Sequence, residues 1–247
     1  CLTALYMALQ KKSARSMILF GMALSFKLQT VFFLPALLPL WLRKDIKLRH
    51  LALIPAAYMA MMIPAFWGGK SLHHALTVYT AQASTYNFMT VNGPSLYNFL
   101  PASMDRGMLY TMFSGMAMAL GMAMLAIVCL MVCLHREHIT REGTLLTCLL
   151  VLGGVPFFLP KMHERYTFGA DVLALAIAAY NPKRVWLPLL FGLSSYICYT
   201  AGLPGDAIFD LKWATVFQGA AVALTAAALY RSLNEEKAEA ALAEVKA

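Results

Sequence analysis

Long apolar runs separated by short polar connectors make up most of this chain. The runs cover residues 16–42, 51–67, 108–134, 144–160, 167–180, 185–200 and 213–230. About 20 apolar residues in a helix are enough to cross the hydrocarbon core of a membrane. The composition agrees, because 60% of the residues are hydrophobic and 13% are charged, against about 25% charged in soluble domains. The sequence therefore predicts an all-α fold, a polytopic transmembrane helical bundle.

The basic residues predict how the runs are oriented. The net charge of +8 lies mostly in short connectors, which excludes nucleic acid as the expected partner. Connectors rich in Lys and Arg face the cytoplasm. Placing residues 11–15, 43–49, 135–143, 181–184 and the tail on that side leaves five basic residues outside: Lys70, Arg106, Lys161, Arg165 and Lys212. We expect a multi-pass protein of the plasma (inner) membrane, contacting membrane lipids, with a cytoplasmic C-terminus.

Residues 16–42 have a basic cluster at each end. A single crossing would place residues 11–15 and 43–49 on opposite sides of the membrane, against the positive-inside rule. We therefore favour a membrane-dipping hairpin of two short helices, bent near residues 26–29. Lys27 lies in this bend beside Gln29. A lysine at the centre of a membrane helix costs about 2.5–3.5 kcal/mol on insertion scales, so Lys27 either has a partner or reaches the surface.

The sequence predicts one transmembrane domain, residues 1–231, and a cytoplasmic tail, residues 232–247. Cys1 opens what resembles the second half of a span, so we expect the chain to be truncated at its N-terminus. An external loop, residues 68–106, is long for a turn. Within it, apolar residues at helical spacing predict an amphipathic helix at the membrane interface: Leu72, Ala75, Leu76, Tyr79 and Ala83.

The densest group of ionisable side chains is Lys161-Met162-His163-Glu164-Arg165-Tyr166, called here the KMHERY segment. Arg offers a planar fork of donors, Lys a compact charge, and His a charge tunable near neutral pH. Such a cluster at the outer interface suits the phosphate of a lipid-linked substrate, with Glu164 holding a cation in place. A basic collar that grips lipid headgroups is the alternative. We expect neither a metal nor a cofactor.

Two further groups of residues accompany this segment. Asp171 is the one acidic residue well inside an apolar run, and we expect it to pair with Lys27 or Arg165. The external loop mixes aromatic faces with amides, the side chains that suit a sugar or an acceptor. These residues are Tyr86, Asn87, Asn92, Tyr97 and Asn98.

Residues 158–166, Phe-Leu-Pro-Lys-Met-His-Glu-Arg-Tyr, continue with Asp-Val-Leu-Ala-Leu at 171–175. This stretch closely resembles bacterial membrane glycosyltransferases of the C superfamily, nearest to the group related to the GPI mannosyltransferase II. Residues 20–29, with their Phe-Lys-Leu-Gln end, and residues 92–97, Asn-Gly-Pro-Ser-Leu-Tyr, add to the resemblance. Eukaryotic dolichyl-phosphate-glucose glucosyltransferases have His-x-His-Glu-Lys at this place. Here Lys161 stands where that pattern has its first His.

The resemblance implies a glycosyltransferase C-like fold and inverting transfer of a hexose, mannose or glucose. The donor would be a polyprenyl-phosphate-linked sugar, and the acceptor a glycan, lipid or protein on the external face. His163 would contact the donor phosphate, with Arg165, Lys161 and Lys27 assisting. Supporting residues would be Glu164, Gln29, Asp171 and Tyr166. The resemblance also implies a catalytic carboxylate in the first external loop, which we expect upstream of Cys1.

Two other classes remain as alternatives. A secondary transporter or lipid-linked sugar flippase needs repeated discontinuous helices with charges near the midplane, and Lys27 is the one strong candidate for such a charge. A structural membrane subunit would leave the KMHERY segment and the long external loop unexplained.

Overall fold

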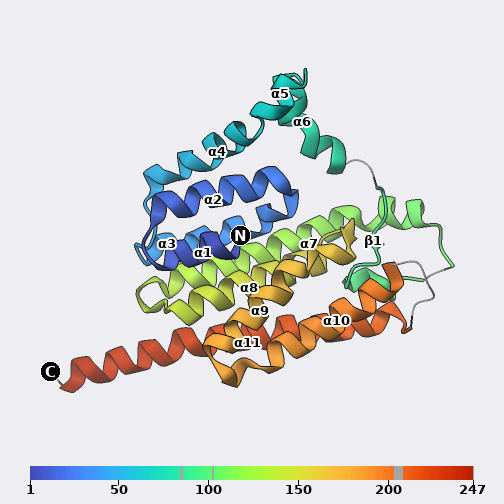
Figure 1. Cartoon of the computed structure of the whole chain (residues 1–247). Helices are drawn as coiled ribbons and strands as arrows, with labels where there is room; N and C mark the ends of the chain where they lie inside the picture. Colours follow the sequence, from blue (N-terminus) through green and yellow to red (C-terminus); the bar gives the residue numbers. More distant parts are fainter. Residues whose placement is uncertain (84–85, 102, 203–207, 247) are drawn as a thin grey trace. The chain divides into compact units, whose positions relative to one another are not determined.

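The protein is a helical membrane protein that divides into two compact units, Cys1–Tyr86 and Asn87–Ala247 (Figure 1). The computed structural model describes residues 1–83, 86–101, 103–202 and 208–246, and the side chains of 81–83 and 235–246 lie outside that description. Five segments are long and apolar enough to cross a membrane: Leu48–Trp67, Arg106–Leu134, Arg141–Phe158, Pro182–Gly202 and Leu211–Asn234. The predicted class, an all-α bundle with membrane-spanning helices, is confirmed at this level.

The first unit begins with α1 (Leu2–Leu9) and α2 (Ser13–Phe26). The helical path breaks at Lys27, whose backbone is extended with φ −155° and ψ 128°. It resumes as a 3-10 helix, η1 (Leu28–Ala36), and then α3 (Leu37–Leu42). Pro35 inside η1 lacks the amide hydrogen that an α-helix would use there. The predicted bend near residues 26–29 is therefore confirmed.

Ser13 shows that the chain turns back on itself. Its hydroxyl accepts a hydrogen bond from the Lys47 backbone N–H at 2.9 Å and lies 2.9 Å from Nδ1 of His50. The start of α2 and the residues that follow α3 are thus in contact, 34 positions apart in the sequence. The two basic clusters, residues 11–15 and 43–49, consequently lie at the same end of the hairpin, as expected.

The rest of the first unit comprises η2 (Leu48–Ala52), α4 (Leu53–Met61), α5 (Ile63–Trp67) and α6 (Leu72–Ala83). The predicted external helix is α6. On it Ala75 is buried, whereas Leu72 and Leu76 are exposed, and the side chain of Ala83 is outside the description. The Tyr79 hydroxyl donates to the Leu24 carbonyl, so α6 lies close to the hairpin bend.

Gly21 allows α2 and α4 to pack closely. A Cβ at this position would lie 2.3 Å from the Ile54 carbonyl oxygen and 2.7 Å from Ala57 Cβ. These neighbours are backbone or fixed atoms, so α4 would have to move. We expect Gly21→Ala to destabilise the protein by about 1–3 kcal/mol, the usual range for overpacking, and to lower the midpoint of thermal unfolding in detergent. The matched change Gly115→Ala, where a Cβ meets nothing within 4 Å, should leave the midpoint unchanged or raise it. Equal midpoints for the two variants would contradict this packing argument.

The second unit contains five helices and a short pair of strands. Its long helices are α7 (Arg106–Leu134), α8 (Arg141–Phe158), α9 (Phe168–Tyr180), α10 (Trp186–Gly202) and α11 (Leu211–Lys246). The buried core follows α8, on which every residue from Leu146 to Phe157 is buried. With 13 residues, α9 is about 20 Å long, short of the roughly 30 Å hydrocarbon core; its predicted crossing stays a prediction. The tail continues α11 as a helix.

The connectors of the second unit gather at two opposite ends of α8. After its C-terminal end come β2 (Met162–His163) and η5 (Glu164–Tyr166). The 87–101 loop meets them there, through β1 (Thr90–Val91) and η3 (Leu96–Phe99). At its N-terminal end η4 (Arg136–His138) lies near α11, and η6 (Pro182–Arg184) is held by Glu142. The grouping agrees with the connectors predicted to share a side.

Candidate functional site

The KMHERY segment and the 87–101 loop are joined by backbone pairing. Thr90 pairs with Met162 and Val91 with His163 in a parallel two-stranded sheet, and Asn92 forms a further bridge to His163. The Lys161 N–H points at the carbonyls of Phe88 and Met89, each at 3.2 Å. Two stretches selected for different chemical reasons, about 70 positions apart, therefore form one site.

Local backbone conformations make this pairing possible. Lys161 and Asn92 both have left-handed backbones, with φ of 64° and 56°. Asn tolerates this region and Lys rarely adopts it. Gly93 then passes so close that a Cβ would lie 2.7 Å from the Met162 carbonyl oxygen. The sharp turn at Pro160-Lys161 exposes the next side chains at the end of the bundle rather than continuing α8.

Glu164 holds its two cationic neighbours. Its carboxylate lies 3.1 Å from Nε of Arg165 and 3.8 Å from Nδ1 of His163. The Glu164 side chain is only 14% exposed, whereas that of Arg165 is 63% exposed. Arg165 can therefore reach a ligand while one edge of its guanidinium is fixed. The His163 ring also contacts Tyr166, with the centroids 5.4 Å apart.

Burial lowers the pKa of the His163 imidazole below its ordinary value. The nearby Glu164 carboxylate raises that pKa and the Arg165 guanidinium lowers it, but desolvation has the largest effect. The ring is therefore mainly neutral at pH 7 and gains its charge only when an anion arrives or the pH falls.

Lys161 connects the segment to the loop by its side chain as well. Its ammonium donates to Oδ1 of Asn87 at 3.2 Å and lies 5.0 Å from the centroid of the Tyr110 ring. The amide and the ring position the charge beside the backbone pairing. Of the expected loop residues, Asn87 thus serves the cation cluster directly, while Tyr86 is exposed on the same loop.

Tyr97 and Asn98 use their polar atoms inside the protein. The Tyr97 hydroxyl donates to the Phe158 carbonyl at 2.6 Å, and burial raises its pKa to about 12. The Asn98 amide donates to the Gly93 carbonyl and to Oγ1 of Thr215, both at 2.9 Å. These contacts fix the loop on the ends of α8 and α11. They make the two side chains supports of the site, whereas the sequence suggested direct contact with a sugar.

Asp171 has a different partner from the one expected with Arg165. Its carboxylate accepts a hydrogen bond from the Ser195 hydroxyl on α10 at 2.9 Å, while Arg165 is paired with Glu164. Asp171 lies one turn into α9, on the side that faces α10, and Arg165 is turned to the surface. The pairing with Lys27 stays a prediction. Asp171 therefore joins α9 to α10 directly beneath the KMHERY segment.

The two predicted residues of the hairpin bend lie in the first unit. Lys27 is exposed. Gln29 is half-buried, and its Oε1 is buried without a hydrogen-bond partner among the described residues. A buried acceptor without a donor costs about 1–3 kcal/mol, so this position is suited to a ligand or to a further protein segment.

Comparisons of the chain with protein-family models, with curated proteins and with solved structures give no match. The chemistry of the site rests on its own residues. Among the described residues, no three His, Cys, Asp or Glu side chains gather where they could hold a metal ion.

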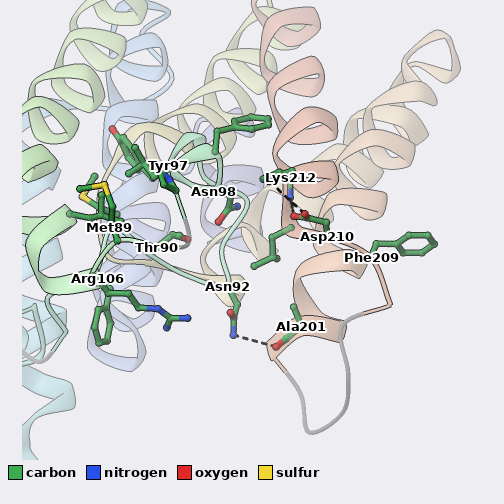
Figure 2. Close-up of a pocket in the computed structure, with 17 residues that line it drawn as sticks. Met89, Thr90, Asn92, Tyr97, Asn98, Arg106, Ala201, Phe209, Asp210 and Lys212 are labelled. Carbon is green, nitrogen blue, oxygen red and sulfur yellow. Dashed lines mark hydrogen bonds and ion pairs between the residues drawn. The ribbon is translucent and has the colours of Figure 1, made fainter.

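A pocket of about 570 Å³ lies beside the site and was not predicted from the sequence (Figure 2). The 87–101 loop, the start of α7 and residues 208–212 form its walls. Asn92 crosses it, with its amide donating to the Ala201 carbonyl at 3.4 Å. In the sequence Arg106 and Lys212 had been noted only as external charges; the structure brings both to this pocket.

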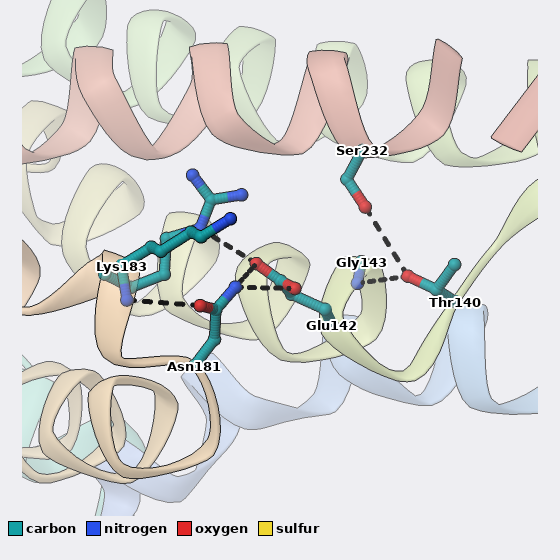
Figure 3. Close-up of polar contacts among 7 residues, drawn as sticks. Thr140, Glu142, Gly143, Asn181, Lys183 and Ser232 are labelled. Carbon is teal, nitrogen blue, oxygen red and sulfur yellow. Dashed lines mark hydrogen bonds and ion pairs between the residues drawn. The ribbon is translucent and has the colours of Figure 1, made fainter. Parts of the chain in front are cut away.

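A second polar cluster lies at the opposite end of α8 (Figure 3). The Glu142 carboxylate receives the Asn181 amide at 3.1 Å and Nε of Arg184 at 2.8 Å. Thr140 caps α8 through the Gly143 N–H and lies 3.5 Å from the Ser232 hydroxyl. This carboxylate is already satisfied by its neighbours, so the cluster fixes the connectors to the bundle and offers little to a ligand.

Proposed function

We propose that this protein is a membrane glycosyltransferase of the C superfamily type. It would transfer a hexose, mannose or glucose, from a polyprenyl-phosphate donor to an acceptor on the external face, with inversion. The observation that carries the proposal is the backbone pairing of the KMHERY segment with the 87–101 loop. The two motifs that resemble this superfamily most and least specifically are thereby neighbours, at one end of a bundle of apolar helices.

The cations of the KMHERY segment suit the donor phosphate. Arg165 presents an exposed planar fork, and Lys161 a compact charge beside Asn87. The half-buried His163 ring adds a donor whose charge grows as negative charge develops on the leaving phosphate. Fixed donors aimed at developing charge are the largest single contribution to many enzymatic rate enhancements. Lys27 and Gln29, in the hairpin bend, remain further candidates for this phosphate. The general base is not assigned among these residues.

The proposal is tested with membranes that carry the protein and membranes that lack it. Each is supplied with polyprenyl-phosphate mannose or glucose, radiolabelled in the sugar, and label in membrane acceptors is counted. Label above the background with one of the two donors is the expected result. Label that stays at background with both contradicts the proposal. Movement of an intact donor between leaflets of sealed vesicles, without transfer, would favour the flippase alternative.

Donor binding should depend on pH through His163. Because the pKa of the free site lies below the ordinary value of 6.5, the ring is neutral at pH 7.5 and becomes charged as the pH falls. A phosphodiester keeps its single negative charge across this range. Affinity for the polyprenyl-phosphate sugar should therefore rise between pH 7.5 and 5.5, by about fivefold if the hydrogen bond gains about 1 kcal/mol on charging.

The control for this dependence is His163→Gln, which keeps an N–H donor and cannot titrate. Its donor affinity, measured in nanodiscs over the same pH range, should be flat. A rise of equal size in the variant would assign the dependence to another group.

A further inference from the structure

The pocket next to the site has its own chemistry, separate from that of the KMHERY segment. Its volume of about 570 Å³ falls within the range of about 300–1,000 Å³ that is usual for small-molecule sites. Thr90 and Asn92 line it, while Val91 between them pairs with His163. One strand therefore has the pocket along it and the KMHERY segment as its partner, and neighbouring strands are only about 5 Å apart.

Arg106 is the cation best placed to bind an anion in this pocket. It is the first residue of α7, where a positive charge opposes the helix dipole. Its guanidinium lies over the Phe88 ring, with Cζ 6.0 Å from the centroid, and Figure 2 shows it extending toward the strand that carries Thr90 and Asn92. In the described part of the chain no carboxylate lies within 4 Å of it. A stacked guanidinium is suited to an oxyanion.

The remaining charges of the pocket nearly cancel. Lys212 lies 3.8 Å from Oδ2 of Asp210, and the Asp210 carboxylate also accepts the Lys212 N–H at 2.9 Å. The net charge of the lining is therefore that of Arg106. Aromatic faces complete the walls: Phe99 and Phe209, both about half exposed, together with Phe88.

We propose that this pocket binds the acceptor through a hydroxylated ring that carries an anionic group. The aromatic faces and the Asn92 amide suit the ring, and Arg106 suits the anion. The inference rests on the proposed function for the word acceptor; binding itself does not depend on transfer. A ligand held here would lie one strand away from the cation cluster, the separation that a donor and an acceptor require.

Direct binding tests the proposal without a transfer assay. The protein in nanodiscs of phosphatidylcholine is titrated with glucose 6-phosphate, glucose or inorganic phosphate, and binding is followed by ligand-observed NMR. Glucose 6-phosphate should bind more tightly than either fragment. Arg106→Gln should weaken it by at least about tenfold, as expected for a charge-assisted hydrogen bond, and Phe99→Ala by about fivefold.

Two variants give the controls. Arg136→Gln removes an exposed arginine from the opposite end of the second unit and should leave binding unchanged. His163→Ala, which tests the transfer reaction, should also keep it, so failure of the proposed function and failure of this inference are distinguishable. Equal binding of glucose 6-phosphate to the parent and to Arg106→Gln would overturn the proposal. So would its complete loss in nanodiscs of phosphatidylglycerol, because a lipid headgroup would then be the occupant.

Discussion

Replacing His163 by alanine should lower sugar transfer by about 10²–10³-fold, the usual loss when one donor to a developing negative charge is removed. The ring lies between Glu164 and Tyr166 at the end of the bundle, outside the buried core that follows α8. The variant should therefore remain folded. The measurement is the initial rate of label transfer from the polyprenyl-phosphate sugar, with the thermal unfolding midpoint as the second readout.

The matched control is His74→Ala, which removes an exposed histidine from α6. It should transfer sugar at the parent rate. Near-normal transfer by His163→Ala would remove His163 from the mechanism, whatever the fate of the other cations. A fall in rate that tracks a fall in the unfolding midpoint would make the histidine a structural residue.

Gly93→Ala should separate the 87–101 loop from the KMHERY segment. The added Cβ would lie 2.7 Å from the Met162 carbonyl oxygen, 3.1 Å from the Met162 carbonyl carbon and 3.3 Å from that of His163. Backbone atoms cannot rotate away as a side chain can, so the strand pair must open. We expect a local destabilisation of about 1–3 kcal/mol and a loss of transfer of about tenfold or more.

Hydrogen exchange measures this opening directly. Amides of residues 88–93 and 161–163 should exchange faster in Gly93→Ala, while those of α8 keep their protection. Gly68→Ala serves as the control, because a Cβ there meets its nearest atom at an ordinary 3.4 Å. Unchanged exchange in Gly93→Ala would show that the loop and the segment can shift together, and the proposed arrangement would lose its main support.

Charge and apolar length were sufficient to predict most of the fold. The bend at Lys27 followed from two basic clusters that could not lie on opposite sides, and the Ser13 contacts agree with it. Helix α7 begins at Arg106 and ends at Leu134, close to the predicted run of residues 108–134. These features depend on composition summed over many residues, which a sequence reports well.

The site was predictable only in its parts. A two-residue strand has no periodicity, so nothing in the sequence indicated that Val91 would pair with His163. The pairing depends on left-handed backbones at Asn92 and Lys161, and lysine gives no signal for that conformation. The pocket is formed by three segments far apart in the sequence, and the chemistry of Arg106 is apparent only once Phe88 lies beneath it.

The contact between Ser13 and Lys47 has a consequence for how the first unit enters the membrane. Because the hairpin starts and ends at the same face, none of the basic residues that flank it has to be carried through the bilayer during synthesis. Moving one Lys or Arg to the centre of a membrane helix costs about 2.5–3.5 kcal/mol, and Lys27 is the one cation within the hairpin itself. The hairpin can therefore insert from one side as a preformed wedge, before any later helix has been made.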